Sequence, residues 1–272
     1  MVAAIRNFFR PRQDAGVSPV PPRHPRLPKG QRVYAIGDIH GRLDLLEAVG
    51  RAIHDDDARR PDARTTVIFL GDLIDRGPDS AGVIDLVREW ARRDRVRIIS
   101  GNHEELFLHS FTKVGTFRGF LQFGGHATVL SYGVDPKAFA AASLEDARQM
   151  MIAAVPDSHR EFVESFEKLI VIGDYLFVHA GVNPDSPLDD QAGHDCRWIR
   201  EPFLSHPGWL GQMVIHGHTI TEEADIRSNR IGIDTGAFAS GKLTVLGLEG
   251  SQRWLIQSEQ TGAEIQTFAR AA

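Results

Sequence analysis

Residues 33–48 read VYAIGDIHGRLDLLEA and place two polar side chains directly after a short apolar run. Asp38 and His40 are separated by one isoleucine and lie between Gly37 and Gly41. A carboxylate and an imidazole at this point are typical of a strand that ends at a binding site, but a single D-x-H is weak evidence. Its meaning depends on whether other parts of the sequence supply partners.

The rest of the chain alternates apolar runs with segments of helical periodicity. Apolar runs predict strands at 32–36, 65–70 and 95–100, and apolar residues at helical spacing predict helices at 43–56 and 80–93. This β-α-β-α-β series predicts an α/β fold with a largely parallel sheet. Residues 115–170 are mostly helical in pattern, and strands return at 171–180, 212–219, 229–237 and 242–249. The β-rich end predicts a second sheet, so we expect a two-sheet β-sandwich flanked by helices.

The composition limits the classes of protein that the chain can represent. Its 272 residues are 42% hydrophobic, which is enough to fill a sizeable core. The net charge of -5 gives no reason to expect nucleic acid or an anionic membrane as partner. Cys196 is the single cysteine, which excludes an internal disulfide, and we recognise no signal peptide or membrane-spanning run. We therefore expect a cytoplasmic protein without a membrane span, whose oligomeric state the sequence leaves open.

Residues 1–29 differ in composition from the remainder of the chain. They are rich in Pro and Arg and have no apolar periodicity. Such a composition cannot offset the entropy cost of ordering, so we predict a disordered basic tail followed by a single domain over 30–272. A docking arm for an acidic partner or a membrane surface is the alternative, suggested by Phe8 and Phe9 among the arginines.

Four further motifs combine a glycine with polar residues after predicted strands. They are GDLIDRG at 71–77, GNHE at 101–104, HAG at 179–181 and HGHT at 216–219. Because ligands bind beyond the carboxyl ends of strands in open α/β sheets, we expect these loops to converge on one site. Carboxylates, imidazoles and an amide without cysteine favour Mn, Fe or Zn. There are more such groups than one ion needs, so we predict two ions with Asp72 as the bridging carboxylate.

As an ordered set, the five motifs resemble the signature of PPP-type serine/threonine protein phosphatases. These belong to the calcineurin-like metallophosphoesterases, and the bacterial branch that includes bacteriophage lambda phosphatase is the most similar. The resemblance covers residues 32–250. It implies a two-sheet sandwich with a helical lid insertion, here at about 105–170, and a catalytic domain with two divalent ions, usually Mn²⁺. It also implies direct attack on phosphorus by metal-bound hydroxide, without a phosphoenzyme.

The resemblance implies a role for each motif residue at the metals. Asp38 and His40 would hold the first ion, and Asp72 would bridge to the second. Asn102, which is also expected to contact the substrate phosphate, would complete the second ion together with His179 and the histidine of GHT.

The HGHT motif offers two histidines for the last ligand position. His216 and His218 lie two residues apart, so strand alternation cannot separate them. The family's ligand directly follows glycine and precedes threonine. We therefore predict His218, with His216 as the alternative.

The resemblance also implies residues for the chemistry on the substrate. His103 matches the general acid that protonates the departing oxygen, and Asp75 would orient it. Arg76 matches a clamp on the phosphate, because a guanidinium can hold two phosphoryl oxygens at once. A second clamp is expected after HAG, where we predict Arg200 with Arg197 as its competitor.

The predicted function is that of a metal-dependent phosphatase acting on a phosphoprotein or a small phosphoester. Phosphoserine and phosphothreonine proteins are the expected substrates, and phosphotyrosine is included. The alternative is a symmetrical dinucleoside tetraphosphate hydrolase, since that family shares the core motifs. A catalytically silent binding module is disfavoured because no predicted ligand is missing. We expect Glu104 to be a structural acceptor, Asp234 to be a turn residue or a support for the metal ligands, and Cys196 to be a small buried side chain.

Overall fold

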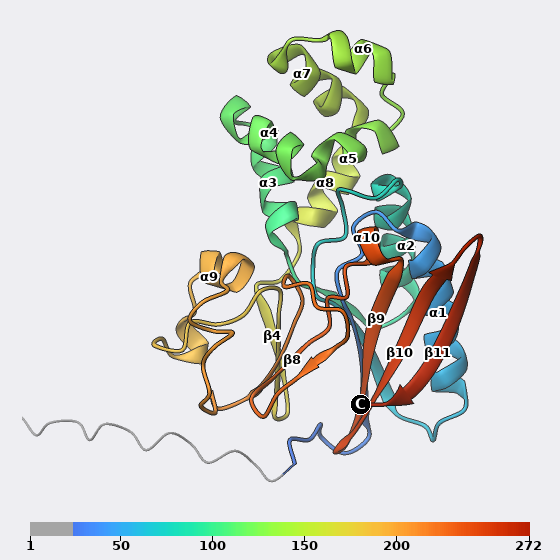
Figure 1. Ribbon diagram of the computed structural model, residues 1–272, viewed down its shortest axis with the longest axis vertical. Helices are drawn as coiled ribbons and strands as arrows, with labels where there is room; N and C mark the ends of the chain where they lie inside the picture. Colours follow the sequence, from blue (N-terminus) through green and yellow to red (C-terminus); the bar gives the residue numbers. More distant parts are fainter. Residues whose placement is uncertain (1–23) are drawn as a thin grey trace, which may run out of the picture.

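The computed structural model describes residues 24–272, whose eleven strands form two sheets (Figure 1). One sheet has the order β11-β10-β9-β1-β2-β3 and the other has the order β4-β5-β6-β8-β7. The strands of the six-stranded sheet are β1 (Gln31–Ile36), β2 (Arg64–Phe69), β3 (Val96–Ile98), β9 (Lys242–Glu249), β10 (Gln252–Thr261) and β11 (Glu264–Ala271). Those of the five-stranded sheet are β4 (Leu169–Ile172), β5 (Tyr175–Val178), β6 (Met213–His216), β7 (Asp225–Ile226) and β8 (Arg230–Gly232). The predicted α/β two-sheet fold is confirmed.

The central strand β1 is buried on both faces, which explains its continuous apolar sequence. Val33 and Ala35 belong to a core cluster that includes Phe177 of the other sheet. Tyr34 and Ile36 point the opposite way, into a cluster with the flanking helices. β1 pairs in parallel with β2, which pairs in parallel with β3, so these three strands end at the same edge. The antiparallel strands β9, β10 and β11 complete the sheet, which is therefore mixed rather than largely parallel.

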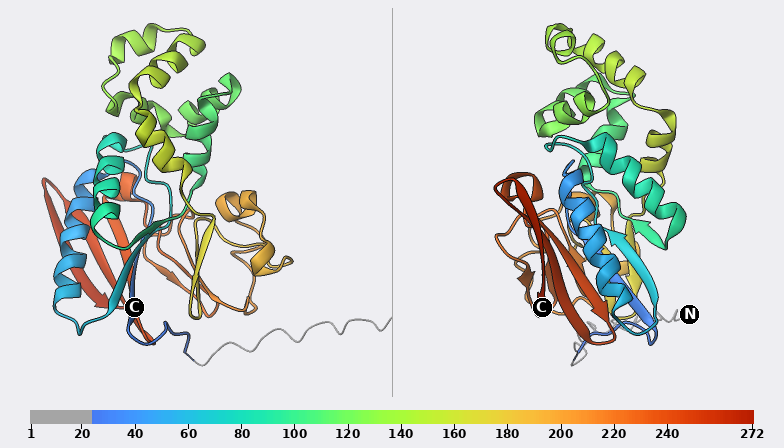
Figure 2. Two further views of the ribbon diagram at one scale, coloured as in Figure 1. Left: turned by 180° about the vertical axis from the view of Figure 1, so that it is seen from behind. Right: turned by 90° about the vertical axis from the view of Figure 1, so that its right-hand side faces the viewer.

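Helices cover the outer faces of both sheets (Figure 2). α1 (Leu43–Ala58) packs on β9, β10 and β11, and α2 (Ser80–Arg93) packs beside it. The Asp79 carboxylate accepts the Gly82 N–H at 2.8 Å and so caps α2. α9 (Gly193–Trp198) covers the five-stranded sheet through the buried Cys196. The short elements η2 and α10 are Leu188–Asp190 and Ala237–Ser240.

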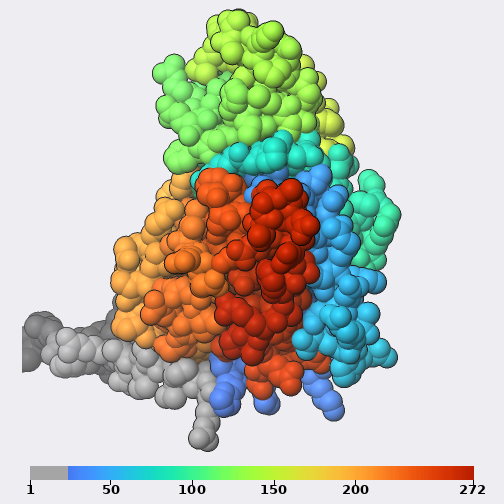
Figure 3. All heavy atoms as spheres, turned by 45° about the vertical axis from the view of Figure 1, so that its right-hand side comes forward, coloured from blue at the N-terminus to red at the C-terminus, as the bar shows by residue number. Residues whose placement is uncertain are grey.

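A helical insertion between β3 and β4 projects as a lobe beyond the ends of the sheets (Figures 1 and 3). It consists of α3 (Asn102–Ser110), α4 (Val114–Phe120), η1 (Leu121–Gly125), α5 (His126–Ser131), α6 (Pro136–Ala141), α7 (Leu144–Ala154) and α8 (Asp157–Glu164). The turn η1 joins α4 to α5 through a kink at Gly124. This insertion is the predicted lid segment. No helix among residues 24–272 has the length and apolar character needed to cross a bilayer.

The chain segment just before β1 packs against the domain. Leu27 is 3% exposed, and its N–H donates to the Gly250 carbonyl at 2.9 Å. The Tyr175 hydroxyl donates to the Pro25 carbonyl at 3.0 Å. The predicted tail boundary at residue 29 is therefore wrong for the described residues 24–29, because apolar contacts and backbone hydrogen bonds fix them. The rest of the predicted tail, residues 1–23, lies outside the described residues.

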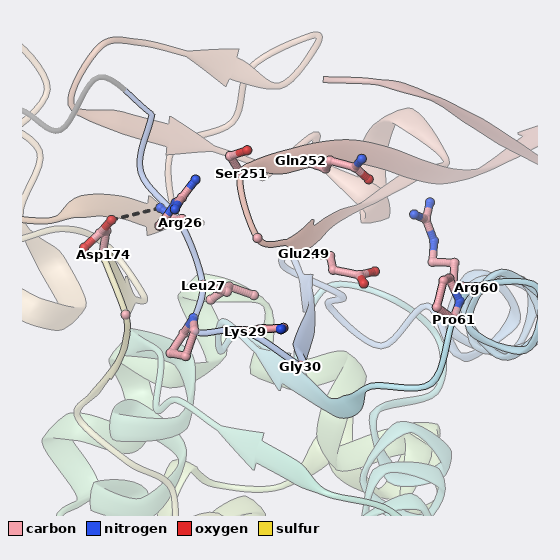
Figure 4. A pocket seen from close by; sticks show the side chains of 13 residues that line it. Arg26, Leu27, Lys29, Gly30, Arg60, Pro61, Asp174, Glu249, Ser251 and Gln252 are labelled. Atoms are coloured by element: carbon pink, nitrogen blue, oxygen red, sulfur yellow. Dashed lines mark hydrogen bonds between the residues drawn. The ribbon is translucent and has the colours of Figure 1, made fainter.

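This packed segment borders a hollow of about 890 Å³ in volume (Figure 4). Gly30 and Asp174, which immediately precede β1 and β5, line it. The hollow therefore lies at the amino ends of these strands, opposite the edge where the sequence motifs occur. Within it, the Asp174 carboxylate accepts the backbone N–H of Arg26 at 3.0 Å.

Candidate metal centre and active site

The loops that follow β1, β2, β3, β5 and β6 converge beneath the helical insertion, as predicted. Two glycines allow the carboxylates of this site to approach the backbone closely. A Cβ at Gly101 would collide with Asp72 Oδ1, and a Cβ at Gly217 would collide with Asp38 Oδ1. Both positions therefore require glycine if the carboxylates keep their places.

Backbone strain is concentrated at this site. Among residues 24–272, the non-glycine residues with positive φ are His40, Asp72, Asp75, Arg76 and His218. Each of the five is a site residue predicted from the sequence. Left-handed conformations of this kind cost about 1–3 kcal/mol each and persist where the surrounding structure enforces them. The strain is therefore an independent indication that this part of the fold serves function.

Two groups of possible metal ligands share Asp72. The first comprises His40, Asp72 and His103, and the second comprises Asp72, His179 and His218. Asp72 Oδ2 lies 3.5 Å from His40 Nε2, whereas Asp72 Oδ1 lies 3.4 Å from His179 Nε2. The two carboxylate oxygens thus face different groups, which is the geometry required of a bridging ligand.

The donor set fits divalent cations because acceptor atoms face one another. The Nδ1 of His179 lies 2.8 Å from the Leu70 carbonyl, which can only accept, so the ring proton sits on Nδ1. Its Nε2 therefore carries a lone pair, yet it lies 3.0 Å from the carbonyl oxygen of Asn102. His40 is oriented in the same way by the Ile74 carbonyl, 2.8 Å from its Nδ1. A backbone carbonyl that fixes the tautomer in this way is a common support of metal-binding histidines.

Burial keeps these imidazoles neutral and disfavours charge on the carboxyl groups. It lowers the pKa of His179 to about 3. Burial raises the pKa of Asp72, and burial together with the neighbouring Asp234 raises that of Asp38 well above its usual range. A divalent cation would reverse the effect on both carboxyl groups, because it favours their charged forms.

The structure distinguishes the two histidines of the HGHT motif. His218 Nδ1 lies 3.0 Å from Asn102 Oδ1 and 3.2 Å from His179 Nε2, and its buried Nε2 has no hydrogen-bond partner among the described residues. His216 Nε2 instead lies 3.3 Å from an Arg230 nitrogen, and its ring packs on Phe203. The structure therefore brings His218 to the other candidate ligands and keeps His216 apart from them.

Asp38 approaches this cluster through the backbone of the HGHT loop. Its two carboxylate oxygens accept the His218 N–H at 3.2 and 3.1 Å. The Asp234 carboxylate interacts with Asp38 and also accepts the Gly236 N–H at 2.8 Å. Asp234 is thus both a neighbour of the predicted ligand Asp38 and a turn residue, the two roles expected for it from the sequence.

His103 and Asp75 form a buried pair, as predicted. His103 Nδ1 lies 2.6 Å from Asp75 Oδ2, and both side chains are fully buried. The other oxygen of Asp75 accepts the Thr128 hydroxyl at 2.5 Å, and its backbone N–H donates to Ser80 and Thr128. Thr128 belongs to the insertion, and it was not predicted as a site residue because no local sequence pattern marks its contact with Asp75.

Two arginines, Arg76 and Arg200, line a cavity together with Asp72, Asn102 and His218. Arg76 lies 2.7 Å from His40 Nε2 and 2.9 Å from His103 Nε2 through its two terminal nitrogens. Arg200 lines the cavity together with Arg76, whereas Arg197 forms an ion pair with Glu105 at 2.6 Å. The geometry therefore favours Arg200 over Arg197 as the second cation facing the cavity.

Glu104 has the structural role expected of it. Its carboxylate accepts the N–H groups of Asp72, Leu73 and Gly101 at 2.8 to 2.9 Å and so ties the second motif to the third. Thr219 was not among the predicted site residues. Its buried hydroxyl lines the cavity without a hydrogen-bond partner among residues 24–272.

Comparison with known proteins identifies the class that this fold and site define. The calcineurin-like phosphoesterase family matches residues 31–224, so the chain belongs to that family. Its homologues are phosphoester hydrolases with a two-metal centre, and the chain is accordingly a metallophosphoesterase.

The relatives that match this chain are named for different activities. The asymmetrical bis(5'-nucleosyl)-tetraphosphatase PrpE of Bacillus velezensis is 26% identical over 237 residues, covering 77% of this chain and 86% of the relative. Shewanella-like protein phosphatase 2 of Arabidopsis thaliana is 25% identical over 187 residues, covering 58% of this chain and 48% of the relative.

Solved structures share the fold at lower identity. A putative diadenosine tetraphosphatase has a TM-score of 0.54 at 21% identity, covering 88% of this chain and 94% of its own. A cold-active protein-tyrosine phosphatase of a psychrophilic Shewanella species has a TM-score of 0.54 at 17% identity, with 89% and 83% covered. These similarities establish the architecture and leave the substrate to be decided by the site.

Proposed function

We propose that the chain is a metal-dependent phosphatase that releases phosphate from phosphomonoesters of proteins or small molecules. The observation that carries this proposal is the buried His103–Asp75 pair, whose Nδ1–Oδ2 distance is 2.6 Å, beside a cavity lined by Arg76 and Arg200. An acid and two guanidinium groups around one cavity can bind a phosphoryl group and protonate the oxygen that leaves it.

Two divalent ions, with Mn²⁺ the expected metal, would be held by Asp38, His40, Asp72, Asn102, His179 and His218. When bound, they would supply Lewis-acid polarisation of the phosphoryl group and acidify the attacking water. Asp75 holds the His103 ring through Nδ1, so Nε2 is the atom that can deliver a proton into the cavity. Arg76 contacts that Nε2 at 2.9 Å and would be drawn to the phosphoryl oxygens when substrate binds.

The size of the cavity supports a small substrate group. Its volume of about 300 Å³ is at the lower limit of the range of about 300–1,000 Å³ typical of ligand pockets. A phosphate with the first part of its leaving group fits this volume better than a dinucleotide held entirely within it. Phosphoserine, phosphothreonine and phosphotyrosine therefore remain the proposed substrates.

A dinucleoside tetraphosphate hydrolase is the second candidate. It is favoured by the relatives named bis(5'-nucleosyl)-tetraphosphatase, which align with about three quarters of this chain. Their names specify asymmetrical cleavage, whereas the alternative expected from the motifs is the symmetrical type.

A product assay separates the two candidates. The full chain loaded with Mn²⁺ is incubated with phosphoserine, phosphothreonine and phosphotyrosine peptides and, separately, with diadenosine tetraphosphate. We expect inorganic phosphate from at least one peptide at a higher kcat/KM than cleavage of the dinucleotide. Faster cleavage of the dinucleotide would establish the second candidate. Asp72→Asn, prepared in parallel, reports any contaminating phosphatase.

A further inference from the structure

Three large apolar side chains line the cavity that contains Asp72 and His218. Phe123, Trp198 and Ile220 form this surface, which we call the apolar wall. Phe123 is 46% exposed and Ile220 is 51% exposed. The three side chains line one cavity, and a contiguous apolar surface of this kind is typical of a ligand-binding groove.

The fold fixes Phe123 against the catalytic residues. Phe123 belongs to the turn η1, and the next residue, Gly124, kinks the chain with φ of +110°. The Gly124 carbonyl accepts the Arg76 N–H at 3.1 Å, and a Cβ on Gly124 would lie 2.7 Å from Arg76 Cγ. The turn therefore places the Phe123 ring at a defined position beside the phosphate clamp.

Trp198 is held from the other side of the cavity. Its indole N–H donates to Glu105 at 2.6 Å, which leaves the apolar ring as its contribution to the cavity. The Phe123 and Trp198 rings lie 6.2 Å apart with an interplanar angle of 75°. This arrangement can accept the edge or face of a further ring.

The wall lies on the side from which the leaving group departs. The Phe123 ring is 6.3 Å from the His103 ring, at an angle of 88°. His103 is the proposed proton donor to the departing oxygen, so the group attached to that oxygen must lie beside His103. Phe123 is therefore placed to touch the first atoms of the leaving group.

We propose that the apolar wall, with Phe123 as its main residue, selects substrates in which an aromatic ring is bonded directly to the phosphate oxygen. Aryl phosphates such as phosphotyrosine are then preferred over alkyl phosphates such as phosphoserine. This inference rests on the proposed phosphomonoesterase function and specifies its substrate class. A favourable ring pair is expected to change kcat/KM by about three- to tenfold.

The test compares two peptides of identical sequence that carry phosphotyrosine or phosphoserine. We expect Phe123→Ala to lower the ratio of kcat/KM for the phosphotyrosine peptide to kcat/KM for the phosphoserine peptide about three- to tenfold. Phe123→Tyr should restore this ratio, because it keeps the aromatic ring. The matched control is Phe268→Ala, because Phe268 is also 46% exposed but lies on β11. Metal content and melting temperature are measured for every variant.

The outcomes separate the two proposals. If the wild-type chain releases phosphate and Phe123→Ala lowers both kcat/KM values equally or neither, the inference is wrong while the proposed function stands. If the wild-type chain with full metal occupancy hydrolyses neither peptide, the proposed function fails and the inference fails with it. A fall in the phosphotyrosine-to-phosphoserine ratio that occurs in Phe123→Ala but not in Phe268→Ala supports both the proposed function and the inference.

Discussion

Replacing His103 by Asn tests the proposed general acid through its dependence on the leaving group. The imidazole is fully buried, and its Nδ1 is 2.6 Å from Asp75, so the shorter amide of Asn cannot take over proton delivery at the Nε2 position. A positioned acid contributes about 10²- to 10⁴-fold to a step that needs the proton. We therefore expect His103→Asn to lower kcat by about that factor for a phosphoserine peptide, whose leaving group is a poor alkoxide.

The same variant is expected to affect p-nitrophenyl phosphate far less. p-Nitrophenolate is stable without a proton, so its kcat falls by less than about tenfold if chemistry limits both rates. His103→Asn is thus expected to slow alkyl phosphates more than aryl phosphates. Phe123→Ala is expected to do the opposite, because it lowers kcat/KM for aryl phosphates. The two changes can therefore be distinguished in one panel of substrates.

The assay requires steady-state kinetics on both substrates and metal analysis of the same preparations. Metal content matters because Asn102, next in the chain, is a proposed ligand, and a lost ion would slow both substrates alike. His109→Asn is a matched control on the exposed side of α3. Equal losses on both substrates at full metal occupancy would refute general acid catalysis by His103 and indicate a positioning role.

The remaining predictions concern the metals, the N-terminal segment and one glycine. Chelation should abolish activity and lower the melting temperature, because ions that bind the folded state stabilise it. Of the divalent ions added back, Mn²⁺ should restore both properties best. A chelated, metal-free sample that kept full activity would exclude the two-metal site. Deleting residues 1–23 should leave the melting temperature unchanged. Deleting residues 1–28 should lower the free energy of unfolding by about 2–5 kcal/mol, because it removes the buried Leu27. Identical chemical-denaturation curves for the two truncated chains would contradict this. Gly217→Ala should lower metal content, because its methyl group collides with a predicted ligand, and unchanged stoichiometry by elemental analysis would show that the loop adapts.

The parts of the fold that the sequence predicted are those with strong local patterns. β1 and β2 are apolar runs buried on both faces, and the predicted helix at 80–93 matches α2. β10 and β11 were not predicted. β11 is exposed at most positions, so it carries no alternating apolar pattern, and it is held by pairing along β10. Its stability comes from a neighbouring strand and not from its own residues.

The candidate site divides in the same way. The predicted ligands follow strands in short motifs, so strand ends alone bring Asp38 and Asp72 together. The contacts from the insertion, Thr128 on Asp75 and Phe123 beside His103, depend on how the helical lobe packs, and no local pattern marks them. The first residues of the domain were misassigned because a Pro-rich composition hides the few side chains that are buried.

The site combines features that are individually unfavourable for folding. Five non-glycine residues hold positive φ, at about 1–3 kcal/mol each, against a typical net stability of about 5–15 kcal/mol for a whole domain. The positive φ of Asp72 is one example, because the backbone N–H groups of Asp72 and Leu73 both donate hydrogen bonds to the Glu104 carboxylate and so hold the loop in place. The facing acceptor atoms of His179 and Asn102 add a repulsion that no described hydrogen bond relieves. A cation between them turns that repulsion into coordination, so the strain and the buried carboxylates together favour a fold that is completed by metal.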